Sequence, residues 1–171
     1  MKHKNEIEVL NYQTEKEVGE GLQSGTSKGS GKPNVYLIYD FPDQLSVKDL
    51  RKFLAKEGYF VLEPNFEGTL IDRRNKHENN LITADIILIY YGRENILWLR
   101  TKLLDILKSP GLGRHKPQFN SAVYVSQGVK FTAETVLNYQ VALISATDIF
   151  PPKSLKEFLN QVRTSYAAVS E

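Results

Sequence analysis

The hydrophobic pattern from Asn34 onward alternates between short apolar runs and longer segments with helical periodicity. Runs rich in β-branched and aromatic residues predict five strands, at 35–39, 59–62, 84–91, 122–125 and 141–144. Apolar positions that recur at helical spacing predict helices at 47–57, 72–80, 95–108 and 133–138, and a final helix that begins at 154. The run at 84–91 is apolar almost throughout, which is typical of a central parallel strand buried on both faces.

The regular alternation of strands and helices predicts an α/β fold. Parallel neighbours need crossover connections, so we expect one five-stranded parallel sheet with helices on both faces. The expected strand order is the flavodoxin-like order 2-1-3-4-5. Ligands of such sheets bind beyond the carboxyl ends of the strands. The sequence therefore directs attention to four connecting segments, 40–43, 65–69, 92–95 and 126–128.

The first 33 residues differ from the rest of the chain. Residues 24–33 are nearly all small or polar, which predicts a flexible linker. Before them, a few apolar residues lie among many charges, enough for a short helix: Ile7, Val9, Leu10, Val18 and Leu22. We therefore expect a tail or linker over 1–33, with a short helix as one alternative, and one folded domain over 34–171.

Composition narrows the classes of function. The net charge of +2 over 171 residues gives no global reason to expect nucleic acid or an anionic membrane as partner. The absence of cysteine excludes disulfides, thiolate metal sites and cysteine nucleophiles, and agrees with a reducing cytoplasm. No apolar run approaches the roughly 18 residues of a membrane-spanning helix. His77 and His115 lack the paired spacing of a metal site, and His77 is expected on a solvated helix face. We expect a cytoplasmic protein without a metal centre.

Candidate chemistry is confined to a few positions. No glycine-rich loop follows the first strand, which argues against a P-loop or a dinucleotide-binding turn. Asp40 and Asp43 stand there instead, either as a carboxylate pair of the phosphoryl-accepting kind or as turn-forming and capping residues. A basic group on and after the third predicted helix could bind phosphate or an acidic partner, although cations also favour a helix C-terminus: Arg100, Lys102, Arg114 and Lys116.

Trp98, the only tryptophan, begins the same helix close to the expected ligand-binding loops. It is either a core anchor or one wall of a cleft. The predicted cleft residues are Asp40, Phe41, Gly92, Trp98 and Lys102.

Several segments together resemble one family: 35–40, 65–68, 80–92, 98–103, 108–114 and 122–125. Over about residues 34–162 the chain resembles the bacterial branch of the Toll/interleukin-1 receptor-like (TIR-like) domains. The resemblance implies a flavodoxin-like fold, in agreement with the strand pattern. It also implies that residues 66–74 form the so-called BB loop, through which such domains pair and gate their cleft. The residues in question are Phe66, Glu67, Gly68, Asp72, Arg73 and Arg74.

Many bacterial TIR-like domains cleave NAD with a glutamate four residues after the helix tryptophan, and this chain has Lys102 there. A lysine cannot stabilise the cationic sugar that develops as nicotinamide leaves. The first hypothesis is therefore a non-catalytic signalling module of a bacterial anti-phage protein, without cofactor, that self-associates or docks on other TIR-like or adaptor domains. The second is an NAD-cleaving effector, activated by oligomerisation, whose acid is Asp105 or Glu94. A third is a nucleotide-sensing module that uses Arg100, Lys102 and Arg114.

Overall fold

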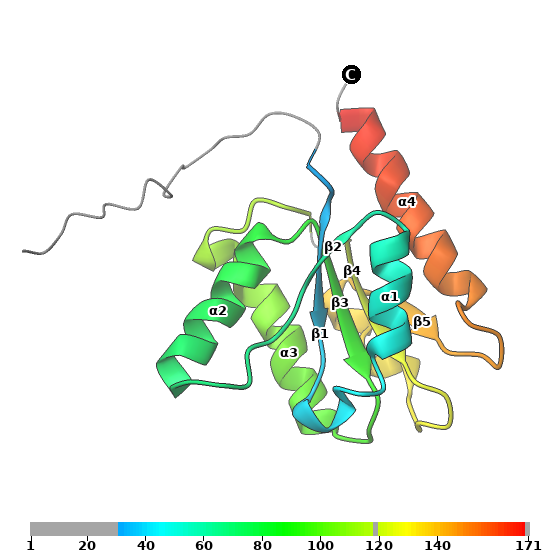
Figure 1. Ribbon diagram of the computed structural model, residues 1–171, viewed down its shortest axis with the longest axis horizontal. Coiled ribbons are helices and arrows are strands. Elements are labelled where there is room, and N and C mark those ends of the chain that lie inside the picture. The colour runs from blue at the N-terminus through cyan, green and yellow to red at the C-terminus, as the bar shows by residue number, and fades with distance from the viewer. Residues whose placement is uncertain (1–30, 118–119, 170–171) are drawn as a thin grey trace, which may run out of the picture. The chain divides into compact units, whose positions relative to one another are not determined.

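A computed structural model describes residues 31–117 and 120–169 of the chain. These residues form one sheet of five parallel strands in the order β2-β1-β3-β4-β5 (Figure 1). The strands are β1 (Asn34–Ile38), β2 (Phe60–Leu62), β3 (Ile86–Tyr91), β4 (Ser121–Val125) and β5 (Ala142–Ser145). The predicted fold class and strand order are confirmed. The predicted tail over 1–33 falls almost entirely outside the described residues.

Four α-helices cover the two faces of this sheet: α1 (Lys48–Lys56), α2 (Leu70–Thr83), α3 (Ile96–Lys108) and α4 (Lys153–Val169). In Figure 1, α2 and α3 lie on one face, and α1 and α4 lie on the other. The helix predicted at 133–138 is instead two short 3-10 turns, Ala133–Thr135 and Leu137–Tyr139. Val136 alone is buried there, so a continuous helix would have little apolar surface to hold it. None of the helices described is both long and apolar enough to cross a membrane.

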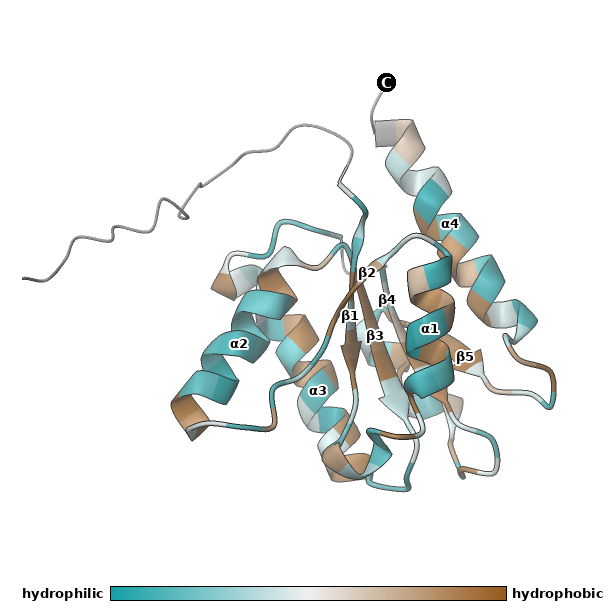
Figure 2. Cartoon of the chain, viewed as in Figure 1, coloured by the Kyte–Doolittle hydropathy of each residue, from teal (hydrophilic) through white to brown (hydrophobic). Residues whose placement is uncertain are grey.

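The core has two halves because side chains of a strand point alternately to opposite faces. All of β3 is buried, and its side chains divide between the halves. Ile86, Leu88 and Tyr90 pack with residues of α1 and α4. Ile87, Ile89 and Tyr91 pack with residues of α2 and α3. Figure 2 shows hydrophobic strands between helices of mixed hydropathy, with hydrophilic residues along much of α1 and α2 and a hydrophobic first turn of α2.

The start of α2 shortens the predicted interaction loop. The Thr69 hydroxyl accepts a hydrogen bond from the Asp72 backbone at 3.1 Å, and Asp72 accepts one from the Thr69 backbone at 3.1 Å. This reciprocal capping box satisfies two amide groups at the helix N-terminus. The loop after β2 therefore ends at Thr69. The loop over 66–74 that the resemblance implied is wrong for residues 70–74, including Asp72, Arg73 and Arg74, which lie in α2. The helical pattern had predicted a helix over 72–80.

Candidate functional site

A cleft of about 490 Å³ lies between α2 and α3, beside the end of β1. Its floor comes from β1 and the residues after it, and one wall includes the loop after β2. The lining residues are Tyr36, Ile38, Tyr39, Asp40, 64–66, Arg73, Arg74, His77, Glu78, Leu81, Trp98, Lys102, Asp105, Lys108 and Leu112. The site thus includes the strand-end segments at 40 and 65–66 and extends from there between the two helices.

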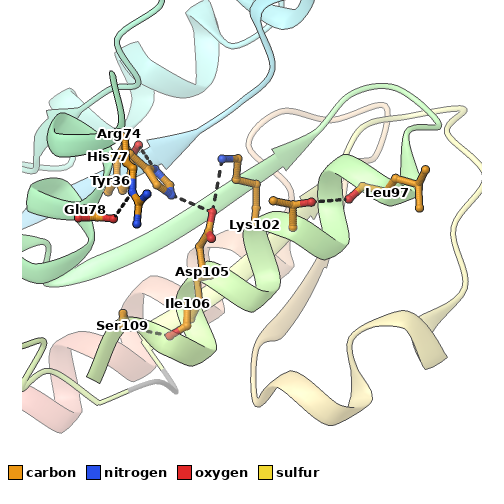
Figure 3. A network of polar contacts seen from close by, with 10 residues as sticks. Tyr36, Arg74, His77, Glu78, Leu97, Lys102, Asp105, Ile106 and Ser109 are labelled. Atoms are coloured by element: carbon orange, nitrogen blue, oxygen red, sulfur yellow. Dashed lines mark hydrogen bonds and ion pairs between the residues drawn. The ribbon is translucent and has the colours of Figure 1, made fainter. Parts of the chain in front are cut away.

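A chain of polar contacts crosses this cleft and joins three elements (Figure 3). The Tyr36 hydroxyl of β1 lies 2.7 Å from Nδ1 of His77 on α2. The His77 Nε2 atom lies 3.0 Å from Oδ2 of Asp105 on α3. The same carboxylate oxygen accepts a longer hydrogen bond, 3.5 Å, from the Lys102 ammonium. Asp105 therefore has two partners inside the cleft.

Tyr36 and Asp105, which contact His77 from opposite sides, differ in charge. Burial opposes ionisation of Asp105, but the hydrogen bond from His77 and the charge of Lys102 outweigh it and lower the pKa of the carboxyl below its ordinary value. Burial raises the pKa of the Tyr36 hydroxyl, and a hydrogen bond with Asn80 opposes this only in part. At neutral pH the network therefore holds a carboxylate at one end and a neutral hydroxyl at the other.

Charged groups of both signs face the cleft. Its lining includes four cationic side chains, Arg73, Arg74, Lys102 and Lys108, and three carboxylates, Asp40, Glu78 and Asp105. One cation and one carboxylate pair within α2, where Arg74 Nε lies 2.8 Å from Glu78 Oε1. With a neutral His77, the cleft thus has a small excess of positive charge.

Aromatic side chains also line the cleft, and one of them, Phe66, packs on two others. The Phe66 ring centroid lies 5.5 Å from that of Tyr39 and 5.3 Å from that of Phe41. Trp98 lines the cleft from α3 and packs partly against the core on that side of the sheet. Phe66 was predicted in an interaction loop, yet it packs inward against the core. Flat apolar walls beside charged groups suit a ligand that has both an aromatic and an anionic part.

The structure brings together some of the predicted cleft residues. Asp40, Trp98 and Lys102 line the cleft, and Phe41 borders it through Phe66. Gly92 does not line it. An added Cβ at Gly92 would lie 2.5 Å from Tyr90 and 2.7 Å from an Asp43 carboxylate oxygen, so close packing explains the glycine.

The other acids predicted at the strand ends have local partners. Asp40 accepts a hydrogen bond from the Phe41 backbone at 2.9 Å, and Asp43 accepts one from Arg93 Nε at 3.2 Å. Asp40 is therefore a turn-capping residue, and Asp43 is the partner of Arg93 in an ion pair. Glu94 is exposed, accepts a hydrogen bond from the Lys130 backbone at 3.2 Å, and does not line the cleft. Within residues 31–117 and 120–169, no three acidic or histidine side chains are grouped as metal ligands.

The predicted phosphate-binding group is divided by the fold. Arg114 is buried, and its Nη1 donates hydrogen bonds of 2.6 Å to the carbonyls of Leu81 and Ala84 at the end of α2. Lys116 donates a 2.8 Å hydrogen bond to Asp85. Arg100 is exposed on α3 and does not line the cleft. Of the four predicted cations, Lys102 alone lines it.

His77 is the site residue that sequence reasoning missed. Its side chain is 18% exposed and lies inside the cleft, so the prediction of a solvated position is wrong. The spacing of α2 held a signal, because His77 is four residues before the buried Leu81 and four after Arg73. The many charged residues next to His77 in the sequence led to the wrong prediction that its side chain is exposed to solvent. Arg73, Arg74 and Glu78 line the cleft together with His77, whereas Asp72 and Lys76 do not.

Comparison with known proteins adds no family. No protein-family model matches the chain, and no curated protein is significantly similar to it in sequence. The geometry of the cleft is therefore the basis for interpreting its function.

Proposed function

We propose that this chain is a TIR-like signalling module of a bacterial anti-phage protein that acts by self-association or partner docking and does not cleave NAD. One observation carries the proposal: the Lys102 ammonium shares the Asp105 carboxylate with His77 in the cleft. Cleavage at the nicotinamide bond develops positive charge on the ribose, which a free carboxylate would stabilise. Here the carboxylate is already compensated by a cation, and no cofactor is required for the proposed role.

An apolar pair at the start of α2 supports association. Leu70 is 77% exposed and Ile71 is 70% exposed. They directly follow the capping box of Thr69 and Asp72, which fixes the backbone that presents them. Adjacent large apolar side chains on an ordered helix turn are typical of a protein contact surface. The partner would be a second copy of this chain or another TIR-like or adaptor domain.

The alternative is an NAD-cleaving effector, and a specific observation favours Asp105 as its acid. Asp105 and Trp98 line the same cleft, and the lowered pKa of Asp105 keeps its carboxylate ionised at neutral pH. Glu94 lies outside this lining. Assembly that moved Lys102 away would leave a carboxylate able to stabilise the cationic sugar.

Light scattering over a series of protein concentrations tests the proposal, with released nicotinamide measured in the same samples after NAD is added. The variant Leu70→Glu/Ile71→Glu is expected to remain monomeric, because two charges on the contact would have to be desolvated. Leu137→Glu is the matched control, since Leu137 is also apolar and 71% exposed. The wild type and the control are expected to associate, without release of nicotinamide.

Two results would change this assignment. Equal association of the wild type and the double variant would show that the start of α2 is not the contact. Nicotinamide release that is lost in Asp105→Asn but kept in Glu94→Gln would establish the alternative function.

A further inference from the structure

The geometry fixes the proton positions around His77. In a neutral imidazole one ring nitrogen donates and the other accepts. An ionised carboxylate can only accept, so the His77 Nε2 atom, 3.0 Å from Asp105, is the donor. The Nδ1 atom, 2.7 Å from the Tyr36 hydroxyl, then accepts the hydroxyl proton. Neutral His77 therefore has both ring nitrogens satisfied.

A proton on His77 would change the hydrogen bonds of its neighbours. In the protonated form Nδ1 would donate to the Tyr36 oxygen, and the Tyr36 hydroxyl would need another acceptor. Asn80 lies beside Tyr36 and is 1% exposed. Its amide nitrogen donates to the Glu63 carbonyl at 3.1 Å, whereas its buried Oδ1 atom has no hydrogen-bond partner within the described chain. The residue that contacts Tyr36 therefore carries a spare acceptor, the kind of group that the Tyr36 hydroxyl would need once His77 is protonated.

The charges that face His77 come from every element packed around it. Arg73, Arg74 and Glu78 lie on α2, Lys102, Asp105 and Lys108 lie on α3, and Tyr39 and Asp40 lie at the end of β1. With neutral His77 the lining holds four cations and three carboxylates, and protonation adds another positive charge. The new charge also compensates Asp105. Lys102, whose contact with that carboxylate is only 3.5 Å, then becomes available to an anion.

We propose that the cleft is a proton-linked anion-binding site: a phosphate- or sulfate-bearing ligand binds between α2 and α3, and binding is coupled to proton uptake by His77. Linkage is reciprocal, so a lower pH strengthens ligand binding to the same extent that the ligand favours the protonated imidazole. The inference does not depend on self-association, because all the groups involved belong to one copy of the chain.

Sulfate is the probe, since it stays doubly charged over the pH range of imidazole titration. It is titrated at constant ionic strength against chloride, at pH about 5.5 and about 8, either side of the ordinary imidazole pKa of about 6.5. The indole N–H signal of Trp98 reports binding by NMR, because Trp98 is the only tryptophan and lines the cleft. We expect sulfate to bind about fivefold or more tightly at the lower pH.

The variant His77→Gln keeps a polar side chain that cannot be protonated, so its sulfate affinity is expected to be the same at both pH values. His115→Gln is the matched control, because His115 is exposed and outside the cleft, and it is expected to behave like the wild type. In the wild type itself, the pH midpoint of the His77 ring signal is expected to move upward when sulfate is added, while that of His115 stays.

A pH dependence that persists in His77→Gln would overturn the proposal. So would a Trp98 signal that responds no more to sulfate than to chloride at the lower pH. If His77→Gln does not fold, an unmoved His77 ring signal in the wild type gives the same negative answer.

Discussion

Two cations near α2, Lys102 and Arg114, have different kinds of partner. Lys102 approaches from α3, has a side chain 23% exposed, and shares Asp105 with His77 at 3.5 Å. Arg114 is 3% exposed and donates two 2.6 Å hydrogen bonds to backbone carbonyls at the end of α2. The first cation can exchange its partner, whereas the second holds a helix end. Burial and hydrogen-bond partner, rather than charge, therefore distinguish the partly exposed Lys102 from the structural Arg114.

The unpaired carbonyls at the end of α2 explain why the buried Arg114 guanidinium stabilises the fold. The last carbonyls of a helix have no partner within it, and a buried carbonyl without a hydrogen bond is costly. Burial lowers the pKa of Arg114, although Tyr166 and Asp85 oppose the effect. The arginine nevertheless stays charged, because its ordinary pKa is so high.

The largest expected effect on stability is that of Arg114→Ala. It leaves the carbonyls of Leu81 and Ala84 without their donor, and we expect the free energy of unfolding to fall by about 3 kcal/mol. Urea denaturation measures the change. Arg100→Ala, an exposed arginine of α3, is the control and should change the stability by less than about 0.5 kcal/mol. Equal losses in the two variants would contradict the role given to Arg114.

The variant Tyr36→Phe tests the cleft with a smaller expected effect. Removing the hydroxyl leaves His77 Nδ1 without a donor, so unfolding should become easier by about 1 kcal/mol in urea denaturation. The same change in a His77→Gln background should cost clearly less, because the two residues are coupled. An identical cost in both backgrounds would show that the contact contributes nothing.

The pH dependence of Asp105 is the smallest expected effect. Its pKa is lower in the folded chain than its ordinary value of about 3.9, so the ionised side chain stabilises the fold above that pH. This contribution is lost as the pH falls through the lowered folded-state value. Thermal unfolding should therefore show a weaker loss of stability on acidification in Asp105→Asn, by about 1 kcal/mol or less because the side chain is partly exposed. Parallel curves for the two proteins would be evidence against the ion pair.

The sheet was predictable because its signal is local. A strand buried on both faces must be apolar along its length, and the run that became β3 shows this without knowledge of its neighbours. The start of α2 was also within reach, since Thr69 and Asp72 have the spacing of a capping box. The contacts of His77 with Tyr36 and Asp105 could not be predicted in this way. They depend on how α2 and α3 pack on β1, and no spacing within one segment encodes that packing.

For some site residues the sequence predicted the position in the cleft but not the contacts that the side chain makes there. Trp98 was chosen as the only tryptophan near the expected ligand-binding loops and Asp105 from the resemblance to TIR-like domains, and both line one cleft. Arg114 was grouped with Lys102 because both are basic and near in sequence, but the turn Ser109–Leu112 carries Arg114 to the far end of α2. Nearness in the sequence thus predicted a shared binding role for Lys102 and Arg114, but the fold places them in different environments.

The position of α4 in the chain has a consequence for synthesis. Its residues Leu155, Phe158, Leu159 and Val162 are buried against the face of the sheet that also bears Ile86 and Leu88. Because α4 follows all five strands, that face stays only partly covered by α1 while the polypeptide is still emerging from the ribosome. A nascent chain interrupted before α4 would present a broad apolar surface to chaperones and to neighbouring nascent chains.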